Sequence, residues 1–245
     1  SSGIAEAHVA LARSADILVI APATATSIAR LALGLAEEMV SLTALATSAP
    51  VLVCPAMDPN MYGHPATQAH VQTLKSRGAH FAGPEEGRLA SGHTGLGRMT
   101  EVDSIMGAIR HIIGLAGDLA GKKVVVSAGG TQEPIDPVRY VGNYSSGKMG
   151  FALAEAARDR GAQVVLVTGA SALPDPYAVT TIRVRRAAEM RDAVVEQTAN
   201  ADAVIMAAAV ADYQPAEATG QKIKREETDG LTLHLVRTPD VLREI

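Results

Sequence analysis

Apolar runs alternate with amphipathic segments along the whole chain, and the two patterns predict different elements. In the first half, apolar runs indicate strands at 16–23 and 50–55, with a further short apolar stretch at 79–82. Helical spacing of apolar residues predicts helices at 4–15, 24–40, 65–77 and 102–115. Residues 55–64 and 83–100 show little periodicity, so both are expected to be loops, the second too long for a simple connector.

The second half continues the same alternation. Strands are expected at 124–127, 164–169, 181–185 and 203–208, and helices at 148–160 and 187–199. Polar segments separate them, including a Pro-containing loop at 171–181 and a stretch at 213–230 that we interpret as a mobile flap. The βαβ unit between 124 and 169 requires a right-handed crossover and a parallel sheet.

The order of the elements predicts the α/β fold class, with two doubly wound, Rossmann-like parallel-sheet domains. A short Gly-containing segment at 114–121 is the expected linker, so the domains are placed at 1–115 and 116–245. At 245 residues the chain is long enough for two modest hydrophobic cores. Hydrophobic residues make up 47% of it but aromatic residues only 3%, which is typical of parallel sheets covered by helices.

Charge and cysteine usage argue against several classes of protein. The formal net charge is −4, and scattered Lys and Arg do not predict a nucleic-acid surface. No apolar run approaches the roughly 18–20 residues that span a bilayer, so no membrane partner is expected. The single cysteine, Cys54, leaves no internal disulfide and favours a reducing, cytoplasmic location.

A polar loop before the helix at 148–160 is a candidate phosphate site. Its last residues are Ser145, Ser146, Gly147 and Lys148, whose amides and side chains could hold an anion at a helix N-terminus. The P-loop motif fails here because Met149 stands where Ser or Thr would bind magnesium. The GxGxxG dinucleotide fingerprint is also absent. A tight turn that merely packs is the alternative interpretation.

Four segments of the second half carry a family resemblance. They are GGTQEPIDPVRYVGNYSSGKMG (129–150), AAAVADY (207–213), KIKR (222–225) and TPDV (238–241). Together they resemble phosphopantothenate–cysteine ligase, the synthetase half of the bifunctional bacterial coenzyme A enzyme. The resemblance implies CTP, phosphopantothenate and cysteine as substrates, with Mg²⁺, and an acyl-cytidylate that the amine of cysteine attacks.

The same resemblance assigns roles to individual residues. Asn143 matches the residue that handles the acyl-cytidylate, although an ordinary turn residue is the alternative interpretation. Lys222 matches the lysine that neutralises the triphosphate in the transition state, where a solvated surface lysine is the alternative. The implied nucleotide-binding residues are Gly129, Gly130, Ser145, Ser146, Met206, Ala207, Ala208, Asp212, Lys222, Pro239 and Asp240.

The first half, over about residues 5–113, resembles the flavin-dependent phosphopantothenoylcysteine decarboxylases. His8 matches the active-site histidine, which acts as base in the flavin-linked oxidation of the cysteinyl group before the carboxylate leaves. The segment 21–26 resembles the flavin-contacting PATAN motif, which implies FMN bound by Thr24 and Thr26. The family's substrate-binding motif PxMNxxMW and its flap imply Asp58, Met61 and Arg98 as substrate-binding residues.

Four positions depart from the family pattern, and one of them is Tyr62, which stands where the family has a tryptophan. Thr26 and Asp58 each replace an asparagine, and an ionised aspartate cannot donate a hydrogen bond to a substrate carboxylate. Ser91, the remaining catalytic candidate, stands where the family has a cysteine whose thiol returns reducing equivalents, a step that a hydroxyl cannot perform. A ligase whose first half is a non-catalytic flavin-binding or regulatory module is therefore one alternative. A ligase that uses ATP and lacks the decarboxylase activity is another.

By the same resemblance the chain looks truncated at both ends. The strand and helix that would help to hold the FMN phosphate are missing from the first half, so tight FMN binding by this piece alone is not expected. A homo-oligomer acting on small molecules is the expected form of the protein.

Overall fold

The computed structural model describes residues 6–89, 92–224 and 230–245, in two compact units divided between Ile113 and Gly114. The first unit contains α1 (Ala7–Ser14), β1 (Leu18–Ala23), α2 (Ala25–Leu33), α3 (Met39–Ala46), β2 (Val51–Pro55), α4 (Pro59–Gly63), α5 (Pro65–Ser76), β3 (His80–Phe81), β4 (Glu85–Arg88), β5 (Thr94–Arg98) and α6 (Val102–Gly114). The second contains β6 (Lys123–Ala128), β7 (Gln132–Pro134), β8 (Tyr140–Gly142), α7 (Lys148–Arg158), β9 (Gln163–Thr168), β10 (Thr180–Arg183), α8 (Ala187–Thr198), β11 (Ala203–Met206), β12 (Tyr213–Pro215), β13 (Leu235–Arg237) and a 3-10 turn, Val241–Arg243.

The first unit is built on a parallel sheet of order β1-β2-β3. Ile20 of β1 pairs with Val53 of β2, and both side chains pack against α2 and α5. Ile28 of α2 and Val71 of α5 are almost fully buried in this layer. The apolar runs at 16–23 and 50–55 therefore form strands, as the sequence pattern predicts, and the structure shows that these two strands are neighbours in the sheet.

Three expectations for the first unit are wrong. The segment 24–40 is not one helix, because Gly34 adopts a left-handed conformation with φ of 71° and ends α2. A separate helix, α3, begins at Met39. The segment 83–100, expected to be a loop, contains the antiparallel hairpin β4–β5, and the expected loop at 55–64 contains the short helix α4.

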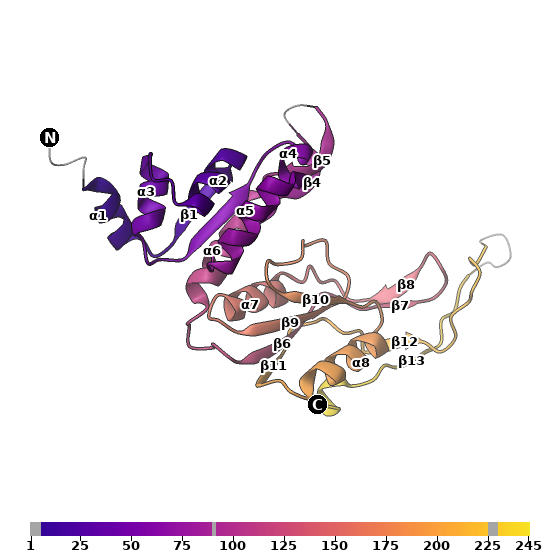
Figure 1. Ribbon diagram of the computed structural model, residues 1–245. Coiled ribbons are helices and arrows are strands. Elements are labelled where there is room, and N and C mark those ends of the chain that lie inside the picture. Colours follow the sequence, from indigo (N-terminus) through magenta and orange to yellow (C-terminus); the bar gives the residue numbers. More distant parts are fainter. Residues whose placement is uncertain (1–5, 90–91, 225–229) are drawn as a thin grey trace. The chain divides into compact units, whose positions relative to one another are not determined.

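The second unit is a parallel sheet of order β10-β9-β6-β11, which confirms the predicted parallel βαβ unit. Phe151 and Ala154 of α7 pack on one face of the sheet, against Val126 and Leu166. Met190 of α8 packs on the other face. Figure 1 shows α7 and α8 on opposite sides of the strands, so this unit is doubly wound.

Two short antiparallel ribbons join segments for which no strands were predicted. In one, Gln132 of β7 pairs with Gly142 of β8, and in the other Tyr213 of β12 pairs with Arg237 of β13. β12 contacts both β7 and β8, and both ribbons extend to the same side of the sheet (Figure 1). Each strand has only three residues, too few for a detectable alternation of apolar and polar side chains.

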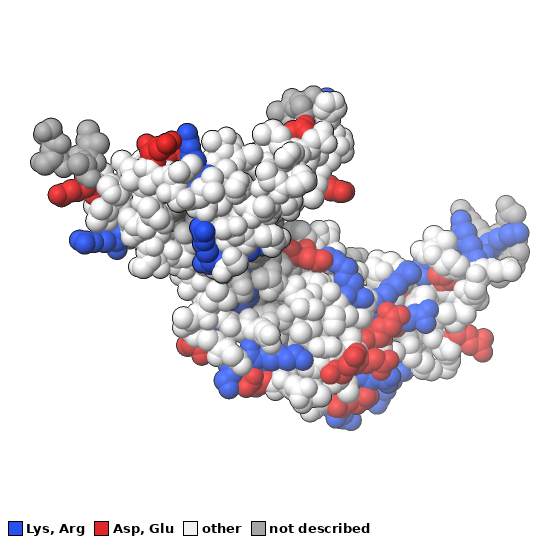
Figure 2. Space-filling view, viewed as in Figure 1, with Lys and Arg blue, Asp and Glu red and all other residues white. Residues whose placement is uncertain are grey.

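The charged side chains are mixed in sign. On the face shown in Figure 2, Lys and Arg lie among Asp and Glu instead of forming one basic patch. Among the described residues, no helix combines the length and the apolar character that crossing a membrane requires.

Candidate functional site

The carboxyl ends of β6, β9 and β11 meet at two adjacent glycines. Gly129 has φ of 72°, and Gly130 forms bridges to both Ala170 and Ala209. A Cβ atom on Gly130 would lie 2.9 Å from the carbonyl oxygen of Asn143. The two glycines therefore let three strand ends and the 143–147 loop approach one another, as expected of a ligand-binding edge in a parallel sheet.

Two hydroxyl groups at this edge have positioning roles that the sequence reasoning missed. The fully buried Ser127 Oγ accepts hydrogen bonds from the backbone N–H groups of Ala207 and Ala208, both at 3.1 Å. Thr131 Oγ1 accepts one from the N–H of Ala211 at 2.9 Å. A Ser two residues before the glycine pair and a Thr directly after it are the sequence signal, since hydroxyls at a strand end commonly bind neighbouring backbone.

An open cavity of about 680 Å³ lies beside this edge, and we call it the β11 cavity. Its walls come from the end of β11, the segment 210–213 and the segment 237–243. Four predicted nucleotide-binding residues line it: Met206, Asp212, Pro239 and Asp240. The backbone N–H of Thr238 donates to the carbonyl oxygen of Asp212 at 3.0 Å, which holds the two aspartate-bearing segments together.

A second hollow, of about 640 Å³, opens at the N-terminus of α7 and contains Ser145, Ser146 and Lys148. We call it the α7 hollow. Ser145 Oγ accepts from the N–H of Gly147 at 3.3 Å, and Ser146 Oγ accepts from the N–H of Lys148 at 3.5 Å. The predicted phosphate-binding serines therefore face the first turn of α7, where a negative charge is favoured.

Asn143 and Lys222 occupy different positions relative to these cavities. Asn143 follows β8, and its Nδ2 donates a hydrogen bond to the carbonyl oxygen of Val210, which lines the β11 cavity. Lys222 is exposed, lines neither cavity, and forms no hydrogen bond or ion pair with another described residue. The structure thus brings Asn143 to the nucleotide candidates, and places Lys222 on the segment between β12 and β13.

In the first unit, the two predicted flavin-binding threonines lie at the carboxyl end of β1. Thr24 Oγ1 accepts a hydrogen bond from the N–H of Ser27 at 3.2 Å and so caps α2, while the side chain of Thr26 is exposed. Ala21 and Pro22, which precede them, are small and exposed. This edge fits one side of a flavin site, because it offers open backbone and a helix N-terminus at the end of a parallel strand.

His8 and Met61 lie on other elements than the carboxyl end of β1. His8 is half-buried on α1, and it makes no hydrogen bond or ion pair with other described residues. Met61 lies on α4 with half of its surface exposed. Ser91 lies outside the residues that the structure describes.

Asp58 and Arg98 share a smaller cavity of about 350 Å³, which we call the hairpin cavity because the β4–β5 hairpin forms one wall. Asp58 Oδ1 accepts from the N–H of Asn60 at 2.9 Å and caps α4. The Arg98 guanidinium pairs with Glu101 and lies 3.8 Å from a carboxylate oxygen of Glu85. Arg88, which was not predicted, also lines this cavity.

The arrangement of the described side chains also bears on metal binding and on the reactivity of the thiol. Across residues 6–89, 92–224 and 230–245, no group of three or more His, Cys, Asp and Glu side chains is placed to hold a metal ion. Asp212 and Asp240 line one cavity, an arrangement that fits Mg²⁺ held mainly by phosphates and water with one or two carboxylates. Cys54 is fully buried in β2, and this burial raises the pKa of its thiol.

The chain is similar to known proteins along most of its length. It is 45% identical over 240 residues to "Coenzyme A biosynthesis bifunctional protein CoaBC" of Mycobacterium tuberculosis strain H37Rv, covering 96% of this chain and 57% of that protein. The protein of the same name from Vibrio vulnificus strain YJ016 is 44% identical, with 97% and 59% covered. The chain therefore spans less than two thirds of the length of these relatives.

Solved structures give partial matches. One, described as the C-terminal domain of CoaBC, is 45% identical, covers 50% of this chain and 57% of that chain, and has a TM-score of 0.44. Another, described as a mutant PPC decarboxylase complexed with pantothenoylaminoethenethiol, is 36% identical, covers 42% and 58%, and has a TM-score of 0.42.

Two family models divide the chain between them. Residues 2–114 match the model described as "Flavoprotein". Residues 119–245, more than half of the chain, match the model described as "DNA/pantothenate metabolism flavoprotein C-terminal domain". The second match contains the glycine pair, the β11 cavity and the α7 hollow, and the chain belongs to the DNA/pantothenate metabolism flavoprotein family.

Proposed function

We propose that the half at 116–245 belongs to a coenzyme A biosynthesis enzyme that joins 4'-phosphopantothenate to cysteine with CTP. The observation that carries this proposal is the β11 cavity, where Met206 and Asp212 of one segment meet Pro239 and Asp240 of another. The α7 hollow lies between the segment that follows β9 and the start of α7, and supplies a helix N-terminus for phosphate. A nucleotide with a negatively charged tail suits two such neighbouring sites.

Each candidate residue then has a chemical task. Asp212 and the Pro239–Asp240 segment hold the nucleoside, and Ser145 and Ser146 hold phosphate at α7. Lys222 balances the negative charge that spreads over the triphosphate as the carboxylate attacks the α-phosphorus. Asn143 donates to the acyl carbonyl of the cytidylate while the amine of cysteine attacks it. Asp212 and Asp240 would hold Mg²⁺ together with the triphosphate, and the ion would supply positive charge there.

The complete native protein should release pyrophosphate from CTP when phosphopantothenate is present, and should consume cysteine in a second step. The test compares CTP with ATP at equal concentration in a pyrophosphate-release assay, with Asp212→Asn as the binding variant. Preference for CTP supports the proposal, and preference for ATP supports the alternative of a ligase that uses ATP. Absence of release with either nucleotide contradicts the ligase assignment.

A second candidate function belongs to the half at 1–115, an FMN-dependent decarboxylation of the ligation product to 4'-phosphopantetheine. The hairpin cavity favours it, because the two predicted substrate-binding residues Asp58 and Arg98 both line it. FMN, when bound, accepts two electrons from the substrate. His8 serves as the base, Thr24 and Thr26 line the flavin edge, and the guanidinium of Arg98 holds a substrate oxygen.

Ser91 distinguishes this activity from a non-catalytic flavin-binding module. The chain's cysteine, Cys54, is fully buried and protonated, so it cannot take over the redox task of the missing thiol. Ser91→Cys should therefore raise the yield of decarboxylated product in the complete protein. If the serine form already turns over as fast, reduction uses another donor. A flavin-loaded protein that releases no CO₂ in either form is a binding module.

A further inference from the structure

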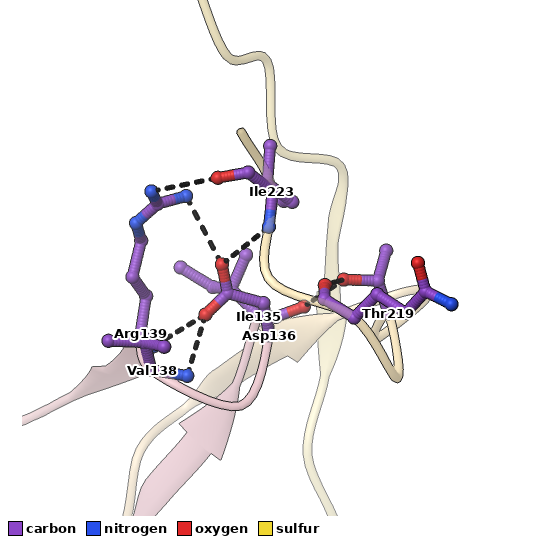
Figure 3. A network of polar contacts seen from close by, with 7 residues as sticks. Ile135, Asp136, Val138, Arg139, Thr219 and Ile223 are labelled. Carbon is purple, nitrogen blue, oxygen red and sulfur yellow. Dashed lines mark hydrogen bonds and ion pairs between the residues drawn. The ribbon is translucent and has the colours of Figure 1, made fainter. Parts of the chain in front are cut away.

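A tight turn between β7 and β8 contacts the segment that carries Lys222. Figure 3 shows Asp136 of this turn facing Ile223, with Arg139 alongside and Thr219 on the other side of Ile135. The side chain of Asp136 is completely buried, although it lies near the end of a slender ribbon. Burying a carboxylate costs free energy unless hydrogen bonds engage all of its lone pairs. The contacts of Asp136 should therefore explain why it is buried here.

The two oxygens of Asp136 have separate partners. Oδ1 accepts from the backbone N–H groups of Val138 at 2.8 Å and Arg139 at 2.7 Å, and so shapes the turn. Oδ2 accepts from the N–H of Ile223 at 3.3 Å and pairs with the Arg139 guanidinium at 3.2 Å. One oxygen thus serves the turn, and the other reaches a residue 87 positions away.

Further contacts fix the same segment in place. The guanidinium of Arg139 donates to the carbonyl oxygen of Ile223 at 3.2 Å, so both backbone groups of Ile223 are held. The N–H of Thr219 donates to the carbonyl oxygen of Ile135 at 3.0 Å. The segment 219–223 is therefore attached to the turn at both ends, and Lys222 lies inside it, next to Ile223.

The β7–β8 ribbon connects this attachment to the other proposed catalytic residue. Arg139 directly precedes β8, and Asn143 directly follows it. Asn143 is held at the β11 cavity by Val210, while the turn at the other end of β8 holds Ile223. A paired strand has a fixed rise per residue, so the ribbon sets a fixed spacing between these two ends.

We propose that Asp136 is a positioning residue that, through Ile223, holds Lys222 at a set distance from the nucleotide site. The kinetic part of this proposal rests on the proposed ligase function, whereas the structural part does not. Asp136 touches no reacting atom. It acts by keeping the Lys222 backbone ordered before the nucleotide arrives, which removes an entropic cost from the step that lysine assists.

Asp136→Asn is the sharpest test, because the two side chains have the same shape. An amide can still accept at Oδ1 from the turn, but its NH₂ group would face the N–H of Ile223 and the guanidinium of Arg139, which are also donors. The variant should therefore keep the turn and release the segment. Asp175→Asn is the matched control, since Asp175 is exposed in the loop after β9 and pairs with Arg183 of β10.

Two measurements are made on the complete protein. Hydrogen exchange by mass spectrometry should show faster exchange over 219–224 in Asp136→Asn, by about tenfold or more, and no change in the control. The kcat of pyrophosphate release should fall about 10- to 100-fold, while KM for CTP changes by less than about threefold. A displaced lysine stabilises the transition state less, but it leaves the nucleotide pocket unchanged. A purely structural defect would not separate kcat from KM.

A second pair of variants covers failure of Asp136→Asn to fold. Ile223→Pro removes the N–H group that donates to Asp136, whereas Ile223→Ala keeps it. Only the proline variant should therefore show faster hydrogen exchange over this segment and a lower kcat. Unchanged exchange in Asp136→Asn or Ile223→Pro overturns the proposal, as does faster exchange with unaltered kcat. If the wild-type protein releases no pyrophosphate, the ligase assignment fails, and the exchange comparison still decides whether Asp136 holds the segment.

Discussion

The side-chain amide of Asn143 donates a hydrogen bond to the carbonyl oxygen of Val210 at 3.1 Å, across 67 positions of sequence. Val210 lines the β11 cavity, and the loop that begins at Asn143 continues to the serines of the α7 hollow. One side chain therefore ties the walls of two cavities together. The Nδ2 atom has a second hydrogen, which can be donated to a ligand.

Asn143→Asp should separate the two steps of the proposed ligation. It replaces the donor with an acceptor and removes the group that stabilises the acyl carbonyl, at a cost of about 10²–10³ in the rate of the cysteine step. Pyrophosphate release should continue, and acyl-cytidylate should accumulate to a level that mass spectrometry detects. Tyr144→Ala, an exposed neighbour in the same loop, is the control. Equal loss of pyrophosphate release without trapped intermediate would show that Asn143 only shapes the loop.

Lys222→Gln should act on the earlier step. Without its charge, pyrophosphate release from CTP and phosphopantothenate should fall by about 10²–10³, because positioning and charge stabilisation dominate phosphoryl-type transfer. Lys122→Gln is the matched control, since Lys122 is exposed and pairs with Asp202 at 2.9 Å, away from the carboxyl ends of the strands. Normal pyrophosphate release by Lys222→Gln would remove Lys222 from the mechanism.

Glu133 should be a stability residue. Its side chain is fully buried, and Oε1 accepts a hydrogen bond at 2.8 Å from the N–H of Ala187, the first residue of α8. Glu133→Ala leaves that N–H unpaired in the interior, so the free energy of unfolding should fall by about 1–3 kcal/mol. Urea denaturation measures this, with the exposed Glu196→Ala on the same helix expected to stay within about 0.5 kcal/mol of wild type.

The stabilisation by Asp136 should depend on pH only in acid. Burial by itself would raise its pKa, yet hydrogen bonds from the N–H groups of Val138, Arg139 and Ile223 and the charge of Arg139 together hold the pKa below the usual aspartate value. The unfolded chain then binds the proton more tightly. The carboxylate's contribution is therefore complete above about pH 4, and it is lost as the pH falls through the lower, folded-state pKa.

The measurement is the difference in urea midpoint between wild type and Asp136→Asn at a series of pH values. This difference should be constant from about pH 8 to about pH 5 and should shrink below about pH 4. A difference that already declines between about pH 7 and pH 6 would mean that the pKa of Asp136 is raised.

Gly150 is required by the packing of α7 on β6. A Cβ atom at this position would lie 2.5 Å from Cβ of Ala128 and 2.8 Å from the carbonyl oxygen of Ser127. Gly150→Ala should therefore destabilise the second unit by about 1–3 kcal/mol, because the helix must move off the strand. Gly63→Ala in α4 is the control, since no atom lies within 4 Å of the added carbon. The thermal midpoint of unfolding, measured for each variant and for the wild type, checks this prediction.

Strongly periodic segments could be predicted from the sequence. The apolar run at 124–127 is the centre of β6, and the helical pattern at 148–160 is α7, shortened by two residues. Both patterns are local, because the period of buried side chains follows directly from the backbone geometry of one element. The parallel arrangement followed from the handedness rule for a βαβ unit.

The short ribbons could not be predicted in the same way. Tyr213 of β12 is exposed, as is its partner Arg237 of β13, and neither strand contains a fully buried residue. These strands form through pairing between distant segments, so a window of neighbouring residues contains no trace of them. The break after α2 had a local signal in Gly34, but helical periodicity on both sides of that glycine concealed it.

For the candidate site, the sequence alone determined which residues match a nucleotide-binding family, including Asp212, Asp240 and Asn143. Only the tertiary structure decided that the two aspartates share a cavity, that Asn143 reaches Val210, and that Lys222 lies in a segment held by Asp136. Motifs record residue types at fixed spacing, whereas these contacts join backbone groups far apart in the chain. Such contacts exist only after the sheet has brought its strand ends together at one edge.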